Sequence, residues 1–179
     1  MEAAGVDIYI ATGYDEGGGM PAHTIGTMAI VPLIADAVSV PVLAAGGIAD
    51  IRTAKAAFAL GAEGVYVGTR FIASTECSAS GVCKQDIVNV KTEDLVEIPA
   101  TFTWRCTPHK LALELRDMAR SGATKEELAA RMGDGAIRTG MLEGNLEAGI
   151  TTISNAAGLI RDVKSCKEIV EELMRDVVF

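Results

Sequence analysis

The sequence contains no run of Lys or Arg residues. The 179-residue chain has 16 basic and 24 acidic residues, which gives a formal net charge of −8 and a pI near 4.8. Nucleic acids and anionic membrane surfaces are bound through basic patches or stripes. The charge pattern therefore argues against both as partners.

Long hydrophobic segments are missing as well. The longest apolar stretches, such as residues 28–38, are interrupted by Pro32 and Asp36 and are shorter than the roughly 20 residues that span a bilayer. The first residues, MEAAGVDIYIATG, do not combine a basic leader with an apolar region and a cleavage site. We therefore expect a soluble, cytoplasmic protein that does not associate with membranes.

Closely spaced metal ligands are also lacking. Cys77, Cys83, Cys106 and Cys166 stand too far apart for a paired C-x-x-C zinc site, so no metal is predicted. An even number of cysteines does not by itself imply a disulfide framework in a chain of this length. Free thiols are expected, and a contact between Cys77 and Cys83 is the alternative.

The first 70 residues, in contrast, contain a clear alternation of strands and helices. Apolar runs predict strands at residues 6–11, 41–45 and 64–67, and apolar residues at three- and four-residue spacing predict helices at 27–38 and 51–60. A strand and a helix in every 20 or so residues indicate parallel strands joined by right-handed crossovers. The predicted fold class is therefore α/β.

Single residues indicate where these two helices begin and end. Asp50 is expected to cap the second helix at its N-terminus, and Gly61 follows its C-terminus. The first helix is expected to begin at Thr27 or, because proline favours the first turn, at Val31, just before Pro32.

The pattern after residue 71 changes to helices, with one extended edge piece at residues 95–99. Thr124 with Glu127, and Ser165 with Glu168, form capping boxes. The last helix is predicted to bury one apolar face, formed by Ile169, Val170, Leu173, Met174, Val177 and Val178. We expect residues 1–76 to form the βα units and residues 77–179 a mainly helical extension packed on them.

Glycine follows two neighbouring strands of the predicted parallel sheet. Gly46 and Gly47 come after one strand, and Gly68 and Thr69 after the next. Backbone N–H groups at such strand ends suit an anion such as phosphate, and glycine lets the anion approach. The sequence therefore predicts a phosphate site, the alternative being that these glycines only make a tight turn and a close packing contact.

A third glycine segment, Glu16 to Gly19, follows the first predicted strand. All three segments are expected on the same face, because the carboxyl ends of parallel strands meet at one edge of a sheet. The alternative for the third segment is a flexible lid.

Three stretches, EGGG, VPVLAAGGIAD and LGAEGVYVGTRF, resemble in order and spacing an FMN-dependent barrel family. This family includes nitronate monooxygenases and the flavin-dependent enoyl-acyl-carrier-protein reductase II. The segment GATKEELAARMGDGAIRTGMLEGNLEAGI is also similar to the C-terminal helical part of reductase-like members. Three strands cannot close an eight-stranded TIM barrel, so the resemblance implies its C-terminal half, with about three βα units followed by a helical region.

The resemblance also implies a cofactor and its contacts. Gly46, Gly47, Gly68 and Thr69 correspond to the residues that hold the FMN phosphate, and Gly18 and Gly19 would lie near the flavin. The implied reaction is oxidation of alkyl nitronates with O2. NAD(P)H-dependent reduction of an enoyl thioester through FMN is the alternative. A flavin-free barrel for a phosphorylated metabolite and an inactive truncated copy also remain open.

The catalytic residue is not predicted. Family members often carry a histidine directly after the glycine pair, whereas this chain has Met20 there and its nearest histidine is His23. His23 is a candidate general base or a surface-loop histidine, and His109 is expected to begin a helix and to be solvated. Exposed apolar strand edges are expected to cause aggregation or pairing with a partner, including a possible homo-oligomer.

Overall fold

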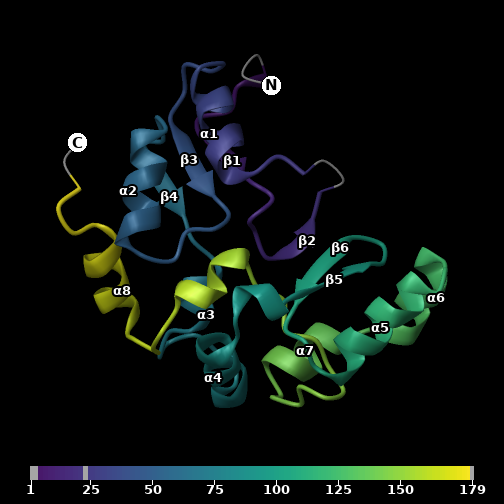
Figure 1. Cartoon of the computed structure of the whole chain (residues 1–179). Coiled ribbons are helices and arrows are strands. Elements are labelled where there is room, and N and C mark those ends of the chain that lie inside the picture. The colour runs from purple at the N-terminus through teal and green to yellow at the C-terminus, as the bar shows by residue number, and fades with distance from the viewer. Residues whose placement is uncertain (1–3, 22–23, 178–179) are drawn as a thin grey trace.

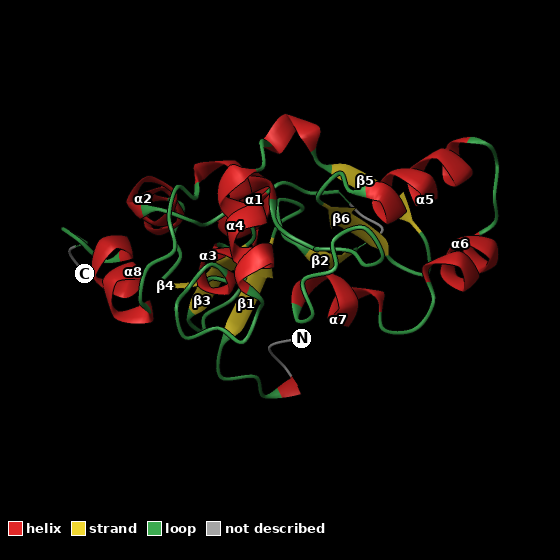
Figure 2. Ribbon diagram, turned by 90° about the horizontal axis from the view of Figure 1, so that it is seen from below, coloured by secondary structure: helices red, strands yellow, loops and turns green. Residues whose placement is uncertain are grey.

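The structure is a computed structural model that describes residues 4–21 and 24–177. It contains two three-stranded sheets, one parallel and one antiparallel, each with its own helices (Figure 1). The view from below shows the two sheets side by side, with the helices α5 (Lys110–Arg120) and α6 (Lys125–Met132) at the far end of the antiparallel one (Figure 2).

The parallel sheet is built from β1 (Tyr9–Thr12), β3 (Val42–Ala45) and β4 (Gly64–Tyr66) in the order β1-β3-β4. The register aligns Thr12 with Ala45 and Ala45 with Tyr66, so the three carboxyl ends are level. Helices α1 (Thr27–Ala35) and α2 (Ile51–Ala59) connect these strands. The α/β class and all five predicted elements are confirmed, with boundaries shifted by up to three residues.

Helix α1 begins at Thr27 rather than at the alternative start, Val31, and contains Pro32 in its interior. Its first turn is held from outside the helix, because the N–H of Thr27 donates to Asp15 Oδ2 at 3.1 Å. This contact is made with a residue 12 positions earlier, so the local preference of proline for a first turn does not decide the boundary.

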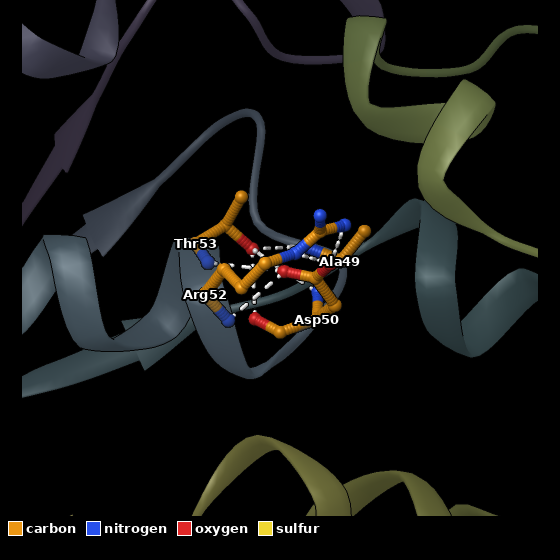
Figure 3. Close-up of polar contacts among 4 residues, drawn as sticks. All are labelled: Ala49, Asp50, Arg52 and Thr53. Carbon is orange, nitrogen blue, oxygen red and sulfur yellow. Dashed lines mark hydrogen bonds and ion pairs between the residues drawn. The ribbon is translucent and has the colours of Figure 1, made fainter.

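Helix α2 has the predicted cap (Figure 3). Asp50 Oδ1 accepts hydrogen bonds from the N–H groups of Arg52 at 3.0 Å and Thr53 at 3.1 Å. In return, Thr53 Oγ1 accepts from the N–H groups of Ala49 and Asp50. Gly61, after the helix, has a φ of +95° that favours glycine.

The antiparallel sheet was only partly predicted. It consists of β2 (Gly18–Met20), β6 (Thr103–Cys106) and β5 (Val96–Pro99) in the order β2-β6-β5. The expected edge piece is confirmed as β5. No strand was predicted for the glycine segment after β1, where β2 begins, or for β6. Glycine is depleted in strands, and β2 is stabilised by a partner more than 80 residues away.

The remaining elements are mostly helical. They are α3 (Thr69–Ile72), α4 (Gly81–Asn89), α7 (Ala136–Met141) and α8 (Cys166–Leu173), with the 3₁₀ helices η2 (Thr92–Asp94) and η3 (Asn155–Leu159). Both predicted capping boxes are present, at the starts of α6 and α8. In α8, Ile169 and Leu173 are buried, but Val170 is exposed, because it lies about 100° around the helix from Ile169. Val178 lies outside the described residues.

Helix α8 packs beside α2 and closes the core of the parallel sheet (Figure 1). Small side chains such as Ala44, Ala54 and Ala57 let the helices approach the strands closely. All four cysteines are free, as predicted. Burial raises the pKa of Cys83 to about 11 and that of Cys106 to about 12, so both thiols stay protonated at neutral pH. Within the described ranges, no helix is both long and apolar enough to cross a membrane.

The parallel sheet leaves apolar side chains open to solvent. Ile8 is 54% exposed, Ile10 43% and Tyr66 59%. Ile10 and Tyr66 belong to β1 and β4, the outer strands of this sheet. Exposed apolar side chains on outer strands promote pairing with another chain.

We therefore expect this chain to self-associate at micromolar concentrations. Light scattering after size exclusion should give a mass above 18.7 kDa, and the double substitution Ile8→Thr and Ile10→Thr should reduce it, because threonine keeps strand propensity while removing apolar surface. Leu142→Thr, at an exposed residue remote from this sheet, is the matched control. A monodisperse monomer that unfolds cooperatively would contradict the expectation.

Candidate functional site

A cleft of about 260 Å³ lies at the carboxyl ends of β3 and β4. Five of the six predicted cofactor residues line it: Gly18, Gly46, Gly47, Gly68 and Thr69. The walls also include Glu16, Tyr66, Thr152 and Ser154. The structure therefore brings the three predicted glycine segments together at one edge of the parallel sheet.

The glycine pair after β3 is packed tightly against the loop after β1. Gly46 and Gly47 have φ values of +88° and +78°. A Cβ atom on Gly46 would lie 2.6 Å from the carbonyl oxygen of Gly13, and one on Gly47 would lie 2.9 Å from Asp15 Cβ. Thr27 Oγ1 holds the turn by donating to the Gly46 carbonyl at 2.8 Å. Close packing is thus sufficient to explain glycine at both positions.

Gly68 differs, because nothing in the described chain requires glycine there. Its φ of −103° is accessible to any residue, and an added Cβ would meet no atom within 4 Å. Gly68 is one of the residues that line the cleft. Gly18 also faces open space, although its φ of +96° favours glycine in any case.

Several backbone donors line the cleft without a partner. Among the hydrogen bonds between described residues, none uses the N–H of Gly46, Gly47, Gly68 or Thr69 as donor. The Thr69 side chain is 7% exposed, and its Oγ1 accepts a hydrogen bond from the N–H of Ser154 at 3.0 Å. The wall is therefore rich in backbone donors, which suit an anion. Because no Lys, Arg or His of the described chain lines it, backbone groups would have to bind that anion.

Gly19 and the histidines do not line this cleft. Gly19 lies in β2, and a Cβ there would point at Phe102, 3.3 Å away; it lines a neighbouring groove beside β1. His23 lies outside the described residues, and Met20, at the position where the family often has histidine, is 2% exposed. His109 begins α5 as predicted, but the expectation that it is solvated was wrong, because its Nε2 lies 2.8 Å from Asp86 Oδ1.

Two charged residues, Glu16 and Arg105, lie at or behind the cleft wall, and the sequence did not indicate Arg105. Glu16 lines the cleft; burial raises the pKa of Glu16, and the positive charge of Arg105 offsets part of this shift. Arg105 lies behind the loop and is 2% exposed. Its only signal in the sequence is an arginine inside a short strand, TWRC, which does not reveal burial.

Asp15 fixes the same loop to two other segments. Its carboxylate accepts hydrogen bonds from the N–H of Thr27 at 3.1 Å and from Asn155 Nδ2 at 3.2 Å. Burial alone raises the pKa of Asp15, but these hydrogen bonds outweigh it and hold the pKa below its ordinary value.

Gly46→Ala and Gly68→Ala should distinguish a glycine required by packing from a glycine that leaves space for a ligand. Gly46→Ala is expected to lower the free energy of unfolding by at least about 1–2 kcal/mol, because a left-handed backbone and a short contact are both unfavourable. Gly68→Ala should change it by less than about 0.5 kcal/mol. Urea unfolding followed by circular dichroism measures both. Equal losses in the two variants would contradict the different roles.

Asp15→Asn should give a pH-dependent loss of stability. Since the folded-state pKa of Asp15 is lowered, its contribution is present above the unfolded value of about 3.8 and is lost as the pH falls through the folded pKa. We expect a deficit of about 1 kcal/mol at pH 7 that shrinks below pH 4. Asp134→Asn, at an exposed residue with no hydrogen bond or ion pair to the described chain, is the control. A constant deficit from pH 3 to pH 7 would contradict the assignment.

Comparisons with known proteins agree with this arrangement. Residues 1–176 match the family described as nitronate monooxygenase. A probable nitronate monooxygenase of Staphylococcus aureus (strain JH9) is 42% identical over 103 residues, which cover 53% of this chain and 29% of the relative. FabK from Thermotoga maritima is 37% identical with a TM-score of 0.88, over 97% of this chain and 55% of FabK.

A nitroalkane oxidase from Streptomyces ansochromogenes shares the fold, with 23% identity and a TM-score of 0.78 over 96% of this chain and 52% of the oxidase. The chain thus spans about half the length of these solved structures. Its parallel βα units are part of a TIM barrel, as predicted. The sequence match over nearly its whole length shows that this chain belongs to the nitronate monooxygenase family.

Proposed function

We propose that this chain is the FMN-binding part of an FMN-dependent oxidoreductase. The observation that carries the proposal is the open space in front of Gly68, for which packing within the described chain offers no reason. Gly47 and Thr69, whose N–H groups have no hydrogen-bond partner among the described residues, line the same cleft. A phosphate group would fill the space and accept from these donors.

The proposed contacts divide along the cleft. Gly46, Gly47, Gly68 and Thr69 would hold the FMN phosphate, and Gly18 would lie near the flavin ring. Gly19 faces the neighbouring groove, so we propose that it does not contact FMN and contributes only as part of β2. The cleft volume, about 260 Å³, is below the roughly 300–1,000 Å³ typical of sites that enclose a whole ligand. We propose that this chain anchors the phosphate end and that the rest of a family-length protein encloses the ring.

Oxidation of alkyl nitronates with O2 is the proposed reaction, supported by the match to the nitronate monooxygenase family and by the curated relatives. Bound FMN would take electrons from the nitronate and pass them to oxygen. The chain's own residues would orient the cofactor and exclude competing reactions. Glu16 and Tyr66 are the residues of the described cleft wall with titratable side chains, and Met20 supplies no base.

NAD(P)H-dependent reduction of an enoyl thioester is the second candidate. The likeness to FabK, at 37% identity over 97% of this chain, favours it. NAD(P)H would then be the co-substrate. In either case the proposed partners are small molecules and, through the open face of the parallel sheet, a further polypeptide or a second copy of this chain. We place the protein in the cytoplasm and propose residues 1–76 as its barrel part, with residues 77–179 as the extension.

Binding of FMN by this chain should be weak and should depend on the phosphate. Titration followed by quenching of flavin fluorescence is expected to show riboflavin, which lacks the phosphate, binding more weakly than FMN. Gly68→Val should weaken FMN binding relative to the unsubstituted chain, because a side chain would occupy part of the cleft. Its circular dichroism spectrum should stay unchanged. If the chain binds other phosphate esters but not FMN, the result would favour the flavin-free barrel. If it binds neither phosphate esters nor FMN, the result would favour an inactive fragment.

A family-length protein that contains this chain and is loaded with FMN should distinguish the two reactions. In anaerobic stopped-flow mixing, we expect a nitronate to bleach the flavin absorbance and NADH or NADPH to leave it unchanged. Bleaching by a reduced nicotinamide alone would instead support the enoyl reductase.

A further inference from the structure

We infer that Arg105 is a positioning residue for the cofactor cleft. Together with Tyr14 and Glu97, it fixes residues 14–18, of which residues 16–18 line the cleft. The inference rests on the proposed function, because the cleft is taken as the cofactor site.

Arg105 is a charged side chain that is almost completely buried, at 2% exposure. Burying a guanidinium is unfavourable unless its donors find acceptors. Nη1 donates to the Tyr14 carbonyl at 2.9 Å and also to the Glu16 carbonyl. The guanidinium carbon lies 4.8 Å from the centre of the Tyr14 ring. The loop after β1 therefore supplies two of the acceptors of this buried guanidinium and the aromatic ring beside it.

Glu97 completes the cluster and ties it to the antiparallel sheet. It is the cross-strand partner of Arg105, and its Oε1 accepts from Arg105 Nη2 at 3.0 Å. Its other oxygen accepts from the Tyr14 hydroxyl at 2.8 Å. On the opposite side, Arg105 is in register with Gly18 of β2. The cluster therefore lies where the two sheets meet.

The loop that Arg105 contacts is also held at Asp15, whose carboxylate accepts hydrogen bonds from Thr27 and Asn155. A Cβ on Gly46 would lie 3.1 Å from the N atom of Glu16, and a Cβ on Gly17 would lie 2.5 Å from the carbonyl carbon of Ile153. These close contacts limit how near the loop can come to its neighbours. Arg105 adds hydrogen bonds to the carbonyl groups of Tyr14 and Glu16, on either side of Asp15, so it fixes the part of the loop that leads into the cleft wall.

Lysine should not replace Arg105. The planar guanidinium presents several donors in a fixed fork, whereas an ammonium concentrates its donors at one point on a flexible stem. Two loop carbonyls and a carboxylate lie around the guanidinium, and an ammonium would leave part of this set unpaired. Keeping the charge is therefore not expected to keep the geometry.

The test compares Arg105→Met, Arg105→Lys and Arg70→Met in two measurements. Arg70 is the matched control for loss of a buried arginine, because it is 4% exposed and pairs with Asp162, away from this loop. Hydrogen exchange of peptides that cover residues 13–19 reports the loop directly, since the N–H groups of Tyr14 and Glu16 are hydrogen-bonded in the folded protein. Titration with FMN reports the site.

Both Arg105 variants should exchange at residues 13–19 about tenfold faster or more, and Arg70→Met should not, once exchange is corrected for global stability. FMN affinity should fall by about tenfold in the Arg105 variants. If Arg105→Met fails to fold, Arg105→Lys decides by the same measurements. Unchanged exchange at residues 13–19 in a folded Arg105 variant would overturn the inference. If the unsubstituted chain does not bind FMN, the proposed function fails, and exchange still tests the role of Arg105 in the loop.

Discussion

The cleft depends on the close approach of Gly46 to the loop after β1. No side chain can be accommodated between the two segments, because a Cβ on Gly46 would lie 2.6 Å from the Gly13 carbonyl oxygen. This approach brings the loop after β1 against the turn after β3, and the cleft lies between these segments and the end of β4. Asp15 and Thr27 then hold the loop and the turn to each other through side-chain hydrogen bonds.

The antiparallel sheet extends this arrangement. The parallel units place Gly46 and Gly68 at the carboxyl ends of the strands, but another part of the cleft wall comes from residues 16–18, which pass into β2. A buried arginine from a strand about 90 residues later connects that wall to β5 and β6. We therefore regard the two sheets as one unit around the site, although one is parallel and the other antiparallel.

Local features were predictable from the sequence because their causes are local. The cap at Asp50, the capping boxes at Thr124 and Ser165, and the strands that end in glycine each follow from residues a few positions apart. The strand β2 was not predictable, since Gly-Gly-Met has little strand propensity and is held by β6 through long-range pairing. For the same reason, sequence proximity placed Gly19 beside Gly18, whereas the alternation of a strand sends them to different grooves.

The central claim is that backbone groups at Gly47 and Thr69 anchor the phosphate of FMN in the space before Gly68. A crystal structure of this chain at saturating FMN tests it most directly. We expect phosphate oxygens about 2.7–3.2 Å from the backbone N atoms of Gly47 and Thr69. A phosphate bound elsewhere on the chain, with the space before Gly68 filled only by solvent, would contradict the account.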